Sequence, residues 1–369
     1  VIDIIQPSTQ RVTPACTHFD VCGGCRLQHL QPNAQLALKQ RLLEDTFWHI
    51  GRVRVQSWLP PLDGPSWGYR HRARLSVKFV TKKNRVLVGF HEKSGRFIAD
   101  IASCAVLAKP LDSLIKPLQE LIMTLSICRH LPQIEVGVGD EALTHHSATN
   151  SVLLIFRILE PLSAEDTRLL LDFETQYGVS FYLQSQGIAS IAPLSTPKTL
   201  HYHLPDYRLR YAFLPHEFTQ VNFAMNTLMV RQAMTLLAPH AGQRIADFFC
   251  GMGNFSLAIA HHGARVLGIE GDKALVARAT ANATQHGLAR AQFMVSNLFQ
   301  MTSEALTELG LFDGWLIDPP RDGALALVQA ITEAQAPRRI VYVSCHPASL
   351  ARDARILVHD KGYTLLSAG

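Results

Sequence analysis

Cys345 is a candidate catalytic nucleophile of this sequence. It lies in the stretch SCHPASLARD, residues 344–353, directly after the apolar run Arg339–Val343, and a helix is expected to start just after it. This order of residues predicts a cysteine at the end of a buried strand. Because a lone buried cysteine is usually an inert core residue, its role depends on which other side chains reach the same place.

Polar side chains follow the other predicted strands of the same region. After about residue 216 the sequence alternates between strand-like and helix-like segments, which predicts a parallel, doubly wound α/β sheet. The strands are expected at residues 244–249, 264–270, 291–295, 313–318 and 339–344. Ligands of such sheets bind beyond the carboxyl ends of the strands. These ends carry Asp247–Asn254, Glu270, Asn297, Asp318 and Cys345.

The first strand end favours S-adenosylmethionine over a dinucleotide. It reads DFFCGMGN, and its two glycines, Gly251 and Gly253, allow a tight turn and a close approach to a ligand. A dinucleotide site would have a third glycine where Ser256 stands. Glu270, at the end of the next strand, is placed to accept hydrogen bonds from two ribose hydroxyls. The glycine pair alone would indicate only a tight turn, but with Glu270 and Asp318 it predicts methyl transfer.

Asp318 and Cys345 together predict the atom that is methylated. The segment Asp318-Pro319-Pro320-Arg321 is of a kind that places a polar side chain against a planar substrate, and it suits amino or carbon methylation. Carbon 5 of a pyrimidine is a poor nucleophile, but a thiolate that adds to carbon 6 makes carbon 5 reactive. Cys345 therefore favours carbon methylation, and Arg321 is expected to favour its thiolate.

Four other cysteines predict a metal centre. Cys16, Cys22 and Cys25 lie on one short stretch, CTHFDVCGGC, and Cys104 follows much later in DIASC. Structural zinc usually takes two close pairs of ligands, whereas three close cysteines and one distant cysteine resemble the ligands of a [4Fe–4S] cluster. Zinc remains the alternative. The two glycines between Cys22 and Cys25 are expected to give the loop room to wrap the cluster.

A basic segment predicts a polyanionic partner. Residues 66–97 contain nine Lys or Arg and one acid, although the whole chain carries a formal charge of only +5. From residue 69 to 79 the sequence alternates with period two, which predicts a strand with Arg70, Arg72, Arg74 and Lys78 on one face. Such a row suits the phosphates of nucleic acid; a solvated basic face is the alternative.

The remaining features of the sequence bound the location of the protein. No apolar stretch reaches the length of a membrane span, and no signal peptide is visible, so we expect a cytoplasmic protein without a membrane partner. We also expect a monomer.

The sequence resembles a known family, the iron–sulfur-containing 23S ribosomal RNA 5-methyluridine methyltransferases that modify position 1939. The resemblance rests on the segments CTHFDVCGGCRLQH, WGYRHRARLS, FTQVN, DFFCGMGNFSL, GIEG, DPPRDG and YVSCHPASLARD. It implies 23S ribosomal RNA as partner, Cys345 as nucleophile, and a [4Fe–4S] cluster. The implied cluster ligands are Cys16, Cys22, Cys25 and Cys104. The implied S-adenosylmethionine site consists of Gln220, Phe249, Asn254, Glu270, Asn297 and Asp318, with Phe218 near a flipped uracil.

The resemblance also implies the domain organisation. Residues 1–15 would be a linker or the tail of an N-terminal OB-type (TRAM) domain that is otherwise missing. Residues 16–30 and 61–215 would form a smaller α+β iron–sulfur and RNA-binding domain. Residues 31–60 and 216–369 would form a Rossmann-like class I methyltransferase domain. The family has a glutamate as general base downstream of the nucleophile, but the only acids among residues 346–369 are Asp353 and Asp360. We therefore expect that base to lie beyond Gly369.

Three other functions fit parts of this pattern. A methyltransferase for another ribosomal uridine or for transfer RNA would share the catalytic residues but often lacks the cysteine cluster. A redox enzyme would use the cluster for electron transfer, although no flavin motif or second cluster motif supports it. A catalytically silent RNA-binding relative would bind the RNA without methylating it.

Overall fold

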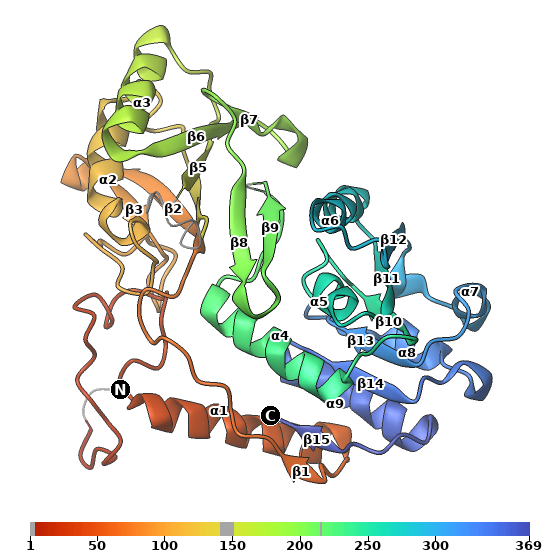
Figure 1. Ribbon diagram of the computed structural model, residues 1–369. Helices are drawn as coiled ribbons and strands as arrows, with labels where there is room; N and C mark the ends of the chain where they lie inside the picture. The colour runs from red at the N-terminus through yellow and green to blue at the C-terminus, as the bar shows by residue number, and fades with distance from the viewer. Residues whose placement is uncertain (1–3, 141–150, 215) are drawn as a thin grey trace. The chain divides into compact units, whose positions relative to one another are not determined.

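The computed structural model describes residues 4–140, 151–214 and 216–369 (Figure 1). They form two compact units. The first contains residues up to Gln35, Gly64–Tyr202 and Ala212–Ala224, and the second contains Leu36–Asp63, His203–Tyr211 and Met225–Gly369. The domain bounds expected from the sequence differ from these by a few residues near 31–35 and 61–63, and at 203–211 and 216–224. The first three residues of the expected linker lie outside the described part.

The first unit is built on a six-stranded sheet in the order β3-β2-β4-β5-β6-β7. The strands are β2 (Arg72–Val80), β3 (Arg85–Gly89), β4 (Gln133–Val138), β5 (Val152–Arg157), β6 (Val179–Gln184) and β7 (Ala192–Pro193). Neighbours are antiparallel except β5 and β6, which run parallel. Parallel neighbours need a crossover, and helix α3 (Ala164–Tyr177) provides it. The unit is therefore α+β, as expected.

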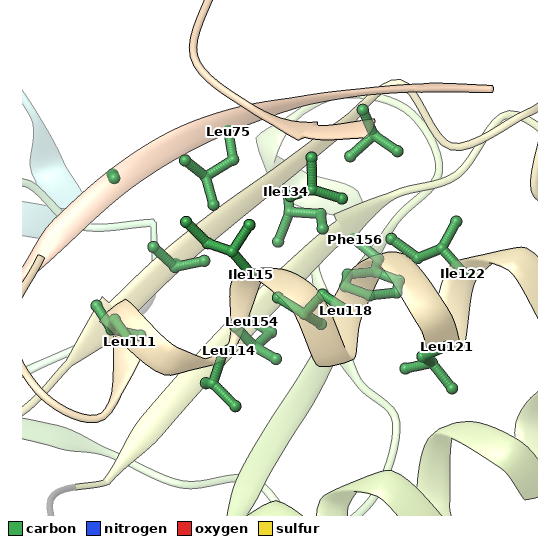
Figure 2. Close-up of a cluster of buried hydrophobic side chains, with 14 of the residues drawn as sticks. Leu75, Leu111, Leu114, Ile115, Leu118, Leu121, Ile122, Ile134, Leu154 and Phe156 are labelled. Atoms are coloured by element: carbon green, nitrogen blue, oxygen red, sulfur yellow. The ribbon is translucent and has the colours of Figure 1, made fainter. Parts of the chain in front are cut away.

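Helix α2 (Ile115–Thr124) packs its apolar face against this sheet (Figure 2). Ile115, Leu118 and Ile122 follow each other at intervals of three and four residues, so they lie on one face of the helix. Figure 2 shows them close to side chains of the sheet, among them Leu75 and Ile134. This buried layer holds β2 with its other face outward.

Strand β2 confirms the predicted alternation. Ala73, Leu75 and Val77 are buried, while Arg74 and Lys78 are exposed. Since successive side chains of a strand point to opposite faces, one side of β2 packs on the core and the other is basic.

The second unit is built on a five-stranded sheet in the order β12-β11-β10-β13-β14. The strands are β10 (Arg244–Phe248), β11 (Arg265–Glu270), β12 (Ala291–Val295), β13 (Gly314–Ile317) and β14 (Arg339–Tyr342). All neighbours run parallel. The predicted doubly wound parallel sheet is confirmed, with each strand end within two residues of its expected place.

Helices precede, connect and follow the strands of this sheet (Figure 1). They are α4 (Phe223–Leu237), α5 (Ser256–His261), α6 (Lys273–Gln285), α7 (Ser303–Glu308), α8 (Leu325–Ala330) and α9 (Pro347–Arg355). The buried centre of the sheet includes Phe248 and Trp315, whose rings meet edge to face with centroids 4.7 Å apart. None of the helices in the described part of the chain is both long and apolar enough to cross a lipid bilayer.

An early segment of the chain packs on α9. Helix α1 (Pro32–Thr46) continues into a π-helical turn, η1 (Phe47–Gly51), and a two-residue strand, β1 (Ser57–Trp58), pairs with β15 (Ser367–Ala368). Phe47 and Val53 form a small buried cluster with Ala351 and Ala354 of α9. A Cβ on Gly51 would lie 2.9 Å from the carbonyl oxygen of Ala351, so this close approach requires glycine. Helix α9, which follows Cys345, is thereby fixed from outside.

Candidate active site

Four polar or reactive side chains lie at one edge of the parallel sheet. Glu270 ends β11, Asp318 directly follows β13, and Asn297 and Cys345 follow β12 and β14 at a distance of two and three residues. The strand order places these ends in a row, with the loop after β10 between those of β11 and β13. The chain reverses its direction of winding at β10, which is where doubly wound sheets bind ligands. Phe249, Asn254 and these residues lie at the strand ends where the sequence predicts them, and their roles stay predictions.

The loop after β10 has a left-handed backbone at three positions. Phe249 has a φ of 62°, Gly251 of 54° and Gly253 of 91°. A Cβ on Gly253 would lie 2.6 Å from the side chain of Leu257, so both its φ and its surroundings require glycine. A left-handed phenylalanine is unusual, and such conformations cluster at binding sites. The Phe249 ring meets that of Phe299 edge to face, with centroids 5.6 Å apart.

The Glu270 carboxylate fastens two loops of this edge. One oxygen accepts a hydrogen bond from the Gly251 amide at 3.0 Å, and the other accepts from the amides of Gly271 and Asp272 at 2.7 and 3.1 Å. A carboxylate has about four acceptor sites, so these bonds fix its orientation. The side chain is therefore oriented at the strand end before any ligand arrives.

Two asparagines of the predicted site have defined partners. Asn254 and Asn226 of α4 exchange two side-chain hydrogen bonds of 2.9 Å. The Tyr211 hydroxyl donates to the Asn254 carbonyl at 3.1 Å. Asn297 accepts from the Phe299 amide at 3.1 Å and so begins a short 3₁₀ turn. Asn226 was not predicted from the sequence, since nothing in the local pattern of α4 distinguishes it from other polar positions.

Two aspartates near the strand ends have raised pKa values. The pKa of Asp247 is raised to about 8, mainly by burial and also by the charges of Asp318 and Glu270, while a 2.5 Å bond from Ser256 acts in the opposite direction. Asp318 retains some exposed surface but is enclosed by protein atoms, and this burial raises its pKa to about 7. A carboxyl group that titrates near neutrality at a strand end is typical of functional sites.

Cys345 is exposed at the carboxyl edge of the sheet. Val343 donates its amide hydrogen to the Ile317 carbonyl at 2.8 Å, so the segments that lead to Cys345 and Asp318 run side by side. The imidazole of His346 accepts the Ser349 amide at 3.3 Å, and Pro347 occupies the first turn, so α9 begins directly after the cysteine. The expected strand–cysteine–helix order is confirmed, but the thiol is exposed rather than part of a buried strand.

Phe218 and Gln220 lie in the first unit, on the segment that precedes α4. Phe218 is 67% exposed, whereas its neighbours Glu217 and Thr219 are buried. The His71 amide donates to the Val221 carbonyl at 2.8 Å, and the Arg72 guanidinium donates to the Glu217 carbonyl. The segment that carries Phe218 and Gln220 is therefore held by β2 and the residues that precede it.

The contacts of Arg72 differ from those expected. Its side chain is largely enclosed and points at the protein's own chain, and burial lowers the pKa of its guanidinium. Arg74 pairs with Glu135 at 2.7 Å yet remains 69% exposed, and Lys78 is exposed. Arg70 is half-buried and donates to the Arg72 carbonyl at 3.1 Å. The alternation predicted from sequence places a residue on a face, but not the partner that its side chain finds there.

The four cysteines expected as cluster ligands line one pocket in the first unit. The residues that line it are Cys16, His18, Phe19, Cys22, Gly24, Cys25, Gln28, Phe90, Ile101, Ser103, Cys104, Ala105 and Val106. Burial raises the pKa of Cys22 and Cys104, and their proximity to Cys25 raises both further. Backbone amides oppose this: Gly24 donates to the Cys22 sulfur at 3.4 Å, and Val106 and Leu107 donate to that of Cys104. Within the described residues, no group of three His, Cys, Asp or Glu side chains is arranged to hold a single metal ion.

The two glycines of this loop allow a close approach to a neighbouring segment, in addition to the role expected from the sequence. A Cβ on Gly23 would lie 2.7 Å from the His91 carbonyl oxygen, and one on Gly24 would lie 3.0 Å from the Phe90 ring. The Gly23 amide also donates to that His91 carbonyl at 2.8 Å. Glycine is therefore required because the loop lies directly against residues 90–92, and this contact carries Cys22 and Cys25 toward Cys104.

Comparisons with known proteins agree with this geometry. Residues 198–362 match the sequence pattern of the tRNA (Uracil-5-)-methyltransferase family. A 23S rRNA (uracil(1939)-C(5))-methyltransferase RlmD from Dechloromonas aromatica (strain RCB) is 50% identical over 373 residues, which cover 100% of this chain and 84% of the relative. The protein of that name from Thiobacillus denitrificans (strain ATCC 25259 / T1) is 52% identical over 370 residues, with the same coverage.

A solved structure supports the fold over both units. The crystal structure of Pyrococcus abyssi tRNA (uracil-54, C5)-methyltransferase in complex with S-adenosyl-L-homocysteine has a TM-score of 0.70 and 25% sequence identity. The match covers 96% of this chain and 81% of that chain. The parallel sheet, its strand-end residues and these matches define a Rossmann-like, S-adenosylmethionine-dependent methyltransferase that acts on carbon 5 of uracil. The chain belongs to the family of 23S rRNA (uracil(1939)-C(5))-methyltransferases RlmD.

Proposed function

We propose that this protein methylates carbon 5 of the uridine at position 1939 of 23S ribosomal RNA, through a covalent bond between Cys345 and carbon 6. The observation that carries the proposal is the match, at about half identity over the whole chain, to relatives named for this reaction. The exposed thiol next to the Asp318 loop supports it, because both groups stand at the edge of the sheet where a ligand binds.

The residues of the strand ends have separate roles in this proposal. S-adenosylmethionine, when bound, supplies an electrophilic methyl group. Glu270 would hold the ribose hydroxyls with its remaining acceptor capacity, and Phe249, Asn254 and Asn297 would border the same ligand. The expected role of Gln220 in cofactor binding stays a prediction from the resemblance.

Cys345 and Asp318 would act on the uracil. The target base must leave its stack to reach a strand-end loop, at a cost of about a few kcal/mol. The Cys345 thiolate then adds to carbon 6, the electron pair of the C5–C6 double bond moves to carbon 5, and carbon 5 takes the methyl group, with S-adenosylhomocysteine as the leaving group. A base then takes the carbon 5 proton, and the electron pair of that C–H bond re-forms the double bond and expels the Cys345 thiolate. Because its pKa is near neutrality, Asp318 can bond to a polar edge of the uracil as acceptor or donor.

We also propose that Cys16, Cys22, Cys25 and Cys104 hold a [4Fe–4S] cluster. Their common pocket and the amide hydrogens directed at two of the sulfurs suit thiolate ligands, since such amides stabilise sulfur-bound clusters. Each cysteine of such a cluster binds a different iron atom, so the sulfurs stand farther apart than around one zinc ion. The cluster would join the N-terminal loop to residues 90–107.

The exposed face of β2 would bind the RNA backbone. Arg74, Lys78 and the exposed Lys82 present positive charge along this strand and the turn that follows it. Arg70 is part of the same proposal, while Arg72 would act on Phe218 and Gln220 by holding their segment. Phe218, two-thirds exposed, would stack on a base, because aromatic rings are the usual partners of unstacked bases.

A pair of substitutions on β2 should reduce the salt dependence of RNA binding. Arg74→Ala combined with Lys78→Ala removes two phosphate contacts, so the slope of log K against log salt should fall by about 1.4 to 1.8. Fluorescence anisotropy with a 23S fragment at several salt concentrations measures it. Arg168→Ala is the matched control, since this exposed arginine of α3 pairs with Glu165 and Asp172. An unchanged slope in the double variant would place the RNA elsewhere.

Transfer RNA is the second candidate substrate. Two observations favour it: the family pattern matched by residues 198–362 is described for tRNA, and the Pyrococcus abyssi structure is that of a tRNA enzyme. The relatives named for 23S rRNA are twice as similar to this chain in sequence identity, which favours the ribosomal substrate.

Mass mapping of methylated RNA tests the substrate. The protein and S-adenosylmethionine are incubated in one reaction with 23S rRNA and in a second reaction with total tRNA, both RNAs lacking 5-methyluridine. The products are digested and sequenced by mass. We expect one new methyl group on uracil carbon 5 at position 1939. Methylation of tRNA alone, or of another ribosomal uridine, would contradict the proposal.

The expectations of a cytoplasmic location and of a monomer remain predictions.

A further inference from the structure

Asp353 is a fully buried carboxylate with no role in the reaction described above. It lies in α9 and has no exposed surface, although Arg352 and Arg355 beside it are partly or fully exposed. Its neighbours at one-residue and two-residue spacing, Ala354 and Ala351, are also buried. An aspartate on the apolar face of a helix is costly unless its oxygens accept hydrogen bonds.

Both oxygens of Asp353 accept hydrogen bonds from other segments. Oδ2 accepts the Ala324 amide and the Tyr342 hydroxyl, each at 2.7 Å. Oδ1 accepts from the Arg352 guanidinium at 2.7 and 2.8 Å. Arg352 in turn donates to the Asp322 carbonyl at 2.8 Å. Burial and the Asp353 carboxylate raise the pKa of Tyr342, so its hydroxyl remains a donor.

These bonds connect three consecutive parts of the sheet edge. Ala324 and Asp322 belong to the loop that begins with Asp318, Tyr342 is the last residue of β14, and Asp353 lies in the helix that follows Cys345. The carboxylate of Asp353 therefore connects the Asp318 loop with the strand before Cys345 and the helix after it.

Gly323 shows how closely the loop fits this carboxylate. Its φ is 77°, and a Cβ there would lie 2.6 Å from Asp353 Oδ2 and 2.7 Å from an Arg352 nitrogen. Gly323 thus lies against the Asp353–Arg352 ion pair. Its neighbour Ala324 donates to Asp353, and its neighbour Asp322 accepts from Arg352. A loop held in this way has little freedom to shift relative to α9.

We propose that Asp353 is a positioning residue for the reaction, which sets the place of the Asp318 loop relative to Cys345. It does not touch the substrate, because it is buried and its oxygens are directed at Ala324, Tyr342 and Arg352. Asp353 is one of the two acids among residues 346–369, and its burial also excludes it as the general base of the reaction. This inference rests on the proposed roles of Cys345 and Asp318.

Asp353→Asn tests the inference, because it keeps the shape but replaces one acceptor oxygen by a donor. An RNA fragment with 5-fluorouridine at the target position reports the step, since fluorine at carbon 5 prevents proton loss and the protein–RNA adduct persists. We expect the rate constant of adduct formation at saturating RNA and S-adenosylmethionine to fall about 10- to 100-fold, as for a misplacement of about 1 Å. The dissociation constants of both ligands should change less than about threefold.

Tyr342→Phe is the second variant, since it removes one bond to Asp353 and keeps the aromatic packing. It should slow adduct formation by a smaller factor, and it decides the question where Asp353→Asn does not fold. Asp206→Asn is the structural control: Asp206 accepts two bonds from Arg231, at 2.7 and 2.9 Å, away from these loops. This control should lower the melting temperature but keep the wild-type adduct rate.

Three outcomes separate the possibilities. Slow adduct formation with preserved ligand affinity in the folded variants supports the inference. Wild-type rates in folded Asp353→Asn or Tyr342→Phe would overturn it, as would parallel losses of rate and ligand affinity, which indicate only general damage. Failure of the wild-type protein to form any adduct would overturn the proposed covalent mechanism, and this inference with it.

Discussion

Cys345→Ala should abolish methylation of the RNA, and with it the covalent adduct on 5-fluorouridine RNA. The thiol is the only group proposed to bond to carbon 6, and without that bond carbon 5 of uracil is too weak a nucleophile to take the methyl group. Removal of the nucleophile from a covalent enzyme commonly costs a factor of about 10⁴ to 10⁶ in rate. We therefore expect product below detection in a single-turnover assay.

Binding of S-adenosylmethionine should survive this change. Cys345 is exposed, and it stands beyond β14, two strands away from the β10 loop where the cofactor is expected. Isothermal titration with S-adenosylhomocysteine should give a dissociation constant within about threefold of wild type, a change below about 0.7 kcal/mol. The loss of activity would then belong to the chemical step and not to an empty cofactor site.

Cys128→Ala is the matched control for this experiment. Cys128 is a half-buried cysteine that packs against the core of the first unit. The variant should methylate at the wild-type rate after correction for its folded fraction. Turnover by Cys345→Ala at more than about a hundredth of the wild-type rate would show that the thiol is not the nucleophile. A loss of about 100-fold or less is no larger than the loss of a general acid or base would cause.

The architecture of the second unit could be predicted because each strand is a short apolar run between polar residues. Runs such as Val266–Ile269 and Trp315–Ile317 are largely buried, so their limits in the sequence lie within one residue of the limits of the strands. Parallel strands also bring their carboxyl ends to one edge by necessity. The register of Glu270, Asp318 and Cys345 thus followed from the order of the elements alone.

The contacts behind the site could not be predicted in this way. Asp353 binds a residue eleven positions earlier and another twenty-nine positions earlier, and no local pattern specifies such partners. One signal was present: an acid that follows Ala351 and precedes Ala354 on the apolar face of a predicted helix must be paired. The partner of Arg72 could not be predicted either. The period-two alternation places Arg72 on the outward face of the strand, but its guanidinium bonds to the segment at 217–221.

Protein purified without oxygen should be brown, with about four iron atoms and about four sulfides per chain. The three cysteines of the N-terminal loop and Cys104 line one pocket although about eighty residues separate them. Four thiols that share a pocket without a disulfide are usually ligands, and here amide hydrogens reach two of the sulfurs. Colorimetric iron and acid-labile sulfide assays measure the content directly.

Cys104→Ser should remove most of this iron and destabilise the first unit. Cys104 is buried, so the variant leaves a hydroxyl where the fourth thiolate is expected, and hydroxyl oxygen is a poor ligand for iron–sulfur clusters. Because the energy of metal binding is also folding energy, the melting temperature should fall by several degrees, as should that of the wild-type protein after exposure to a chelator under oxidising conditions. Cys128→Ser, in the same unit but outside the pocket, should keep its full iron content. One zinc ion per chain with no iron, after purification without oxygen, would show that the four cysteines form a zinc site.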